Sequence, residues 1–86
     1  MTVHTIVLKG ETYHEDYYRL ESSDLFAAAA YVGEIVGELR AAGVPDTHVT
    51  VRAELDAAPY AVEIEVYATP AQAATLGWAL PAPDEA

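Results

Sequence analysis

The chain has 86 residues, no cysteine and a formal net charge of −10, because 14 acidic residues outnumber 4 basic ones. A chain of this length forms one domain that buries roughly 60% of its unfolded surface without disulfides. The lack of cysteine excludes disulfides, thiol nucleophiles and cysteine-ligated metals. The acid excess disfavours direct contact with nucleic acid or with an anionic membrane. We therefore expect a globular domain that carries no cofactor and binds another protein.

The N-terminal sequence gives an expectation about location. Met1 to His4 lack the basic stretch and apolar core of a secretory signal. The longest apolar run, residues 25–33, is well short of the ~20 residues that cross a bilayer. The sequence therefore predicts a cytoplasmic protein with no membrane-spanning segment.

The first predicted element is a hairpin. Residues 3–9 are rich in β-branched side chains and end at Gly10, which is typical of a strand entering a turn. Residues 13–20 form the second strand. Its register stays open because period-two alternation allows either of two pairs to face the core: Tyr13 with Tyr17, or Tyr18 with Leu20.

A long helix is predicted over residues 25–42. Gly43 is a favourable residue to end it, and Pro45 prevents it from resuming. The candidates for its N-cap are Ser22, Ser23 and Asp24. At 100° per residue one apolar stripe faces the sheet, formed by Leu25, Ala28, Val32, Ile35, Val36 and Leu39.

The same helix carries a second row, of small residues, at four-residue spacing: Ala29, Gly33, Gly37 and Ala41. Each glycine inside a helix costs roughly 0.5–1 kcal/mol relative to alanine, so helix propensity does not explain the row. Close approach of another element would explain it. That element is either the C-terminal segment with Leu76, Trp78 and Leu80, or a second protein chain.

A second hairpin follows the helix. Residues 48–55 and 60–68 both alternate apolar and polar side chains, and a short connection joins them. One register agrees with both faces of the hairpin. It gives three facing pairs: Leu55 with Tyr60, Val51 with Ile64, and Arg52 with Glu63.

The C-terminal region begins with a short helix. Thr69, Pro70 and Gln72 form a helix-start signature with a threonine cap, a proline at the first position and a glutamine three residues after the cap. The helix should reach Leu76, and Gly77 can end it. We expect one domain over residues 1–80, followed by a flexible acidic and proline-containing tail over 81–86.

These elements predict an α+β fold with two layers: a four-stranded, mostly antiparallel sheet of two hairpins, covered by the long helix, with a short C-terminal helix appended. The ββαββ order over residues 3–68 resembles the layout of the β-grasp family. In that family the first and last strands lie side by side in parallel. The resemblance involves no sequence motif and assigns no function, and a meander or an incomplete ferredoxin-like arrangement also fits.

The side chains that could carry chemistry form no recognisable catalytic set. Ser22 and Ser23 lie where helix caps lie. The three histidines are too far apart in sequence for a local metal motif, although His14 could meet His4 across the first hairpin. No glycine-rich phosphate loop is present. We therefore expect no enzymatic activity and no metal site.

The outward face of the second hairpin is acidic, and its candidate interaction residues are Glu54, Glu63, Glu65 and Tyr67. Outward residues two apart on a strand are separated by about 6.7 Å, close to two steps of the ~3.4 Å phosphate repeat along one strand of DNA. A row of acids could therefore imitate a phosphate backbone. Small inhibitors of restriction or CRISPR systems use this tactic.

These features predict a non-enzymatic protein-interaction or assembly module. Its partner would be a second copy, giving a homo-oligomer, or a basic protein, and its surfaces would be the apolar helix or tail, the acidic sheet face, or both. The alternative is an acidic mimic of nucleic acid that inhibits a partner by occupying its basic groove.

Overall fold

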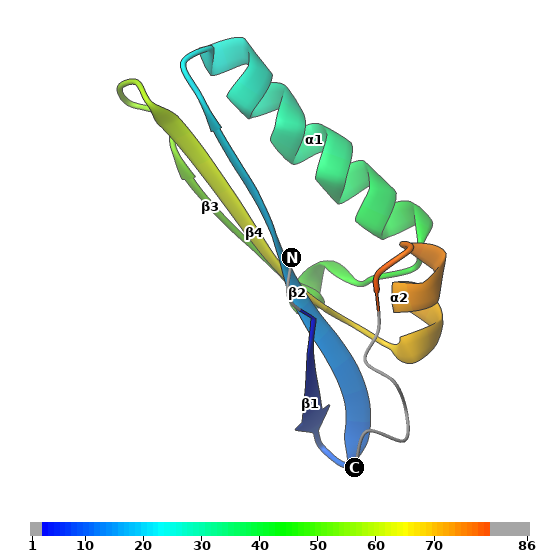
Figure 1. Cartoon of the computed structure of the whole chain (residues 1–86). Coiled ribbons are helices and arrows are strands. Elements are labelled where there is room, and N and C mark those ends of the chain that lie inside the picture. The colour runs from blue at the N-terminus through cyan, green and yellow to red at the C-terminus, as the bar shows by residue number, and fades with distance from the viewer. Residues whose placement is uncertain (1–2, 80–86) are drawn as a thin grey trace.

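Four strands form one sheet, and a long helix packs on one of its faces (Figure 1). The computed structural model describes residues 3–79, and within that range no helix is long and apolar enough to cross a membrane. The predicted α+β class with two layers is confirmed. The elements are β1 (His4–Leu8), β2 (Glu11–Ser22), α1 (Leu25–Ala41), a 3₁₀ turn (Asp46–His48), β3 (Val49–Glu54), β4 (Tyr60–Ala68) and α2 (Pro70–Thr75).

The strand order differs from that of the β-grasp layout. The order is β1-β2-β4-β3, and each of the three pairings is antiparallel. The last strand pairs with the second strand and not with the first, so the parallel pair implied by the resemblance is absent from the described strands. The length of β2 explains this, because residues 11–15 pair with β1 while residues 14–22 pair with β4.

The pairing of β2 with β4 decides which face of the first hairpin is inward. Tyr18 lies opposite Ile64 and Leu20 lies opposite Val62, and both β4 residues are buried beneath α1. Cross-strand partners share a face of the sheet. The inward pair is therefore Tyr18 with Leu20, and Tyr13 and Tyr17 face outward.

The second hairpin has the predicted register, with Val51 opposite Ile64 and Arg52 opposite Glu63. Two of the inward residues of β3 are nevertheless exposed: 42% of Val51 is accessible, and Ala53 is exposed as well, whereas Val49 is half-buried against the core. The reason is that α1 packs mainly on β2 and β4, the two central strands. The edge strand β3 therefore has an inner face that the helix leaves largely uncovered.

Both ends of α1 have the caps that the sequence predicts. Asp24 is the N-cap, and its carboxylate accepts hydrogen bonds from the backbone N–H groups of Phe26 and Ala27. At the other end Gly43 has φ +88°, and the N–H of Val44 donates to the carbonyl of Leu39. This left-handed ending fixes the direction in which the chain leaves the helix toward β3.

The short helix α2 also begins as predicted, with reciprocal hydrogen bonds between Thr69 and Gln72. The chain then folds back onto the sheet, where Trp78 is buried. The indole Nε1–H of Trp78 donates to the Tyr18 hydroxyl at 2.7 Å. This contact ties the C-terminal segment to the middle of β2, and α2 lies next to the C-terminal end of α1 (Figure 1).

Candidate interaction surfaces

The predicted row of small residues on α1 faces open space. Ala29, Gly33, Gly37 and Ala41 are all exposed. A Cβ atom added at Gly33 or at Gly37 would meet no atom within 4 Å, among the described residues. The described part of the C-terminal segment does not cover the row, because Trp78 packs on Tyr18 of the sheet. Leu80 and the predicted tail over 81–86 lie outside the described residues. No described contact within the chain explains the two glycines.

The row belongs to a larger apolar surface. Phe26, in the first turn of α1, is 84% exposed, which makes it the most exposed large apolar side chain described. At 100° per residue it projects from the same side of the helix as Gly33 and Gly37. We call this surface the open α1 face, and it consists of Phe26, Ala29, Gly33, Gly37 and Ala41.

A groove lies between α1 and the uncovered inner face of β3. Its volume is about 200 Å³. Its walls are mainly aliphatic, and two residues of opposite charge, Arg40 and Asp46, also line it. We call it the α1–β3 groove, and it is lined by Val36, Leu39, Arg40, Val44, Asp46, Val49 and Val51.

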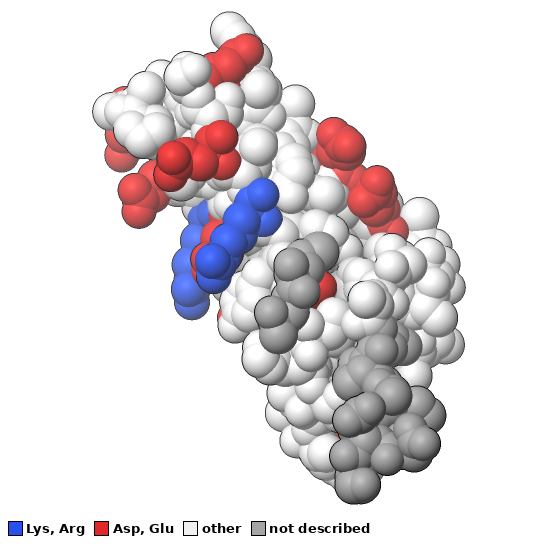
Figure 2. All heavy atoms as spheres, in the orientation of Figure 1, with Lys and Arg blue, Asp and Glu red and all other residues white. Residues whose placement is uncertain are grey.

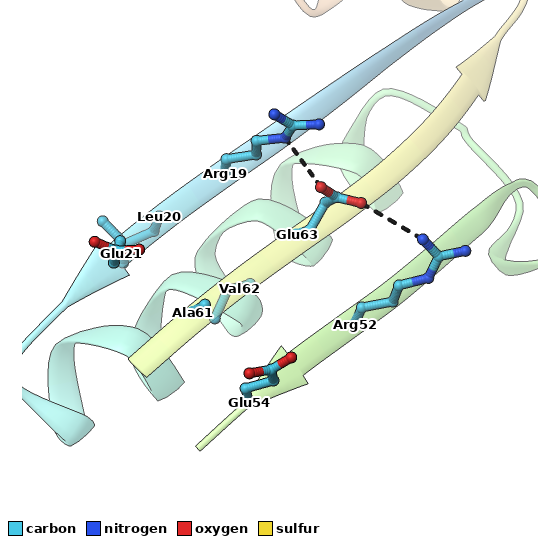
Figure 3. A pocket seen from close by; sticks show the side chains of 8 residues that line it. All are labelled: Arg19, Leu20, Glu21, Arg52, Glu54, Ala61, Val62 and Glu63. Atoms are coloured by element: carbon cyan, nitrogen blue, oxygen red, sulfur yellow. Dashed lines mark ion pairs between the residues drawn. The ribbon is translucent and has the colours of Figure 1, made fainter. Parts of the chain in front are cut away.

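The opposite face of the sheet is less acidic at its centre than the sequence suggests. Glu63 of β4 lies between Arg19 of β2 and Arg52 of β3 (Figure 3). Its carboxylate oxygens are 3.0 Å from Nε of Arg19 and 3.6 Å from an Nη of Arg52. Two cations therefore flank the central acid of the predicted acidic row.

Two residues further along β2 and β3, the outward side chains are acidic again. There Glu21 and Glu54 flank the small side chain of Ala61, and the resulting hollow of about 500 Å³ is also lined by the Arg19, Arg52 and Glu63 group. In Figure 2 the basic side chains in view gather in one patch, with acidic atoms among and around them. The face therefore alternates in sign and does not present an unbroken line of acids.

Tyr67, the fourth predicted residue of this face, is part of an aromatic cluster that sequence reasoning missed. Its ring stacks on His48 with centroids 4.5 Å apart, and Tyr13 meets both rings edge to face. The Tyr13 hydroxyl donates to Glu11 at 2.8 Å, and this hydrogen bond raises the pKa of Tyr13. The outward alternation of β2 would have revealed the cluster if the register of the first hairpin had been known.

The histidines of the first hairpin do not form a metal site. His14 lies opposite Thr5, and His4 lies opposite Glu15, so the two imidazoles are on opposite faces of the sheet. The suggestion that they could meet is wrong, because neighbouring residues of a strand alternate between faces. Across residues 3–79 no group of three or more His, Asp or Glu residues is arranged to hold a metal ion.

Comparisons with known proteins identify no relative. No protein-family model matches the chain, and neither a curated protein nor a solved structure is significantly similar to it. The case for function therefore rests on the surfaces described above.

Proposed function

We propose that this chain is a non-enzymatic protein-interaction module whose binding surface is the open α1 face together with the α1–β3 groove. The observation that carries the proposal is the apolarity of α1 away from its own sheet, where Phe26 is 84% exposed and both glycines face open space. A helix that is apolar on all sides is normally buried. A contiguous exposed apolar surface is typical of a binding site.

The acidic-mimic alternative has less support. A phosphate imitation needs a continuous line of negative charge, whereas Arg19 and Arg52 hold the carboxylate of Glu63. No observation favours a second function. The cytoplasmic location predicted from the sequence also remains a prediction.

The test compares three forms of the protein: wild type, Phe26→Asp and Ala27→Asp. Both variants add one negative charge to the first turn of α1, where the helix dipole favours it. Phe26 lies on the open α1 face, whereas Ala27 is exposed on the flank of the helix that also carries Glu34. Each form is used as bait in an extract of the source cells, and its mass is measured by light scattering.

The proposal predicts that Phe26→Asp loses a protein, or a self-association, that wild type and Ala27→Asp both retain. If the three forms retain the same proteins and have the same mass, the open α1 face is not a binding surface.

A further inference from the structure

Each copy of this chain presents an apolar projection and an apolar recess, and no residue of the described range 3–79 occupies either. The projection is the exposed ring of Phe26 at the beginning of α1. The recess is the α1–β3 groove, which lies beside the C-terminal half of the same helix. Its volume of about 200 Å³ exceeds the ~150 Å³ of an apolar cavity known to bind benzene. The groove is therefore large enough to accept one phenyl ring.

We propose that the occupant of the groove is Phe26 of a second copy, in a symmetric dimer whose two α1 helices lie antiparallel. This inference rests on the proposed function and names its partner. In a two-fold dimer each copy uses the same patch, so one contact pair is made twice. The two helices then form a middle layer between the two sheets. Each helix covers the inner face of β3 in the other copy, which the helix of that copy leaves open.

The position of the groove along α1 agrees with this arrangement. The middle residue of α1 (Leu25–Ala41) is Gly33. An antiparallel pair centred there places residue 26 of one helix level with residue 40 of the other. Arg40 is one of the residues that line the groove. The absence of a side chain at Gly33 lets the two backbones approach at the crossing point.

The charges at this position are complementary. Arg40 would lie near Asp24 of the second copy, whose carboxylate caps the beginning of α1. The pairing of Arg40 with an N-cap aspartate favours a copy of α1 over an apolar helix that has no acidic cap.

Single cysteines test the arrangement directly, because the wild-type chain has none. Gly33→Cys should form a disulfide-linked dimer under mild oxidation, since the two-fold axis brings this residue next to its own copy and a disulfide needs Cα atoms within about 7 Å. Ala29→Cys and Gly37→Cys are the matched controls on the same face. Alone, neither should form a disulfide-linked dimer, and the two should cross-link when mixed, because only an antiparallel pair places residue 29 beside residue 37.

The proposal is overturned if Gly33→Cys forms no more dimer than Ala29→Cys alone, or if Ala29→Cys cross-links to itself while Gly33→Cys does not. Circular dichroism of each variant confirms that the helix is intact. Failure of this test is distinguishable from failure of the proposed function. If the wild-type protein is a monomer and Phe26→Asp still fails to capture a protein that wild type captures, the same surface binds a different partner.

Discussion

Replacing Gly33 and Gly37 by alanine should stabilise the isolated chain. Neither added Cβ would meet a neighbour within 4 Å, so the change acts only through helix propensity and the entropy of the unfolded chain. Each substitution is expected to add about 0.5–1 kcal/mol to the free energy of unfolding. Together they should raise the melting temperature by several degrees, because about 1 kcal/mol corresponds to ~4–8 °C in a domain of this size.

The measurement is urea unfolding followed by the fluorescence of Trp78, the only tryptophan. It is made in a Phe26→Asp background so that association does not contribute. Gly43→Ala is the matched control and should have the opposite sign, because Gly43 has φ +88°, where a side chain costs roughly 1–2 kcal/mol. Destabilisation by Gly33→Ala and Gly37→Ala would contradict the exposure of the row, since it would mean that the row is packed within the monomer.

Three further predictions concern the core and the sheet. Tyr18→Phe removes the acceptor of the 2.7 Å hydrogen bond from Trp78 and should lower the free energy of unfolding by about 1–3 kcal/mol; an unchanged urea midpoint would contradict the assigned contact. Burial raises the pKa of the Tyr18 hydroxyl above 10.0, so the unfolded chain loses the hydroxyl proton at a lower pH than the folded chain does. The stability from the neutral hydroxyl is therefore complete below pH 10 and should fall as the pH rises toward the folded pKa. Tyr18→Phe should weaken this fall of the free energy of unfolding with pH in alkaline urea titrations. Glu63→Gln should lower the free energy of unfolding by no more than about 1 kcal/mol, because Arg19 and Arg52 are largely exposed. A loss of more than about 2 kcal/mol in urea unfolding would show instead that the Arg19–Glu63–Arg52 group is a major source of stability.

The sequence predicts local structure well where short-range chemistry decides it. Asp24 and Gly43 delimit α1 because capping depends on residues within one turn of the helix. The register of the second hairpin follows from agreement between two alternating faces, with Arg52 opposite Glu63. These features need no knowledge of the rest of the fold.

The strand order and the buried polar residues depend on long-range packing, so the sequence could not provide them. The alternation of β2 is compatible with either face, and only its pairing with β4 places Tyr18 inward. That choice also buries Asp16, which is 1% exposed, against the usual preference of a carboxylate for solvent. The parallel pair of the β-grasp layout was wrong for the same reason.

The candidate surfaces were only partly predictable. The row containing Gly33 is visible in the sequence, but its exposure depends on where the C-terminal segment packs. Phe26 was missed because it lies outside the four-residue row. The groove could not be predicted at all, because it exists only where α1 stops short of covering β3.

The proposed dimer is best tested by its absolute mass in solution, by light scattering after size exclusion, for wild type and Phe26→Asp at low and high salt. We expect a wild-type species of twice the 9.2 kDa chain mass that persists at high salt, because apolar contacts are not screened. We expect Phe26→Asp to be a monomer. A wild-type mass of 9.2 kDa at every concentration, or a dimer that Phe26→Asp leaves intact, would contradict the proposed dimer.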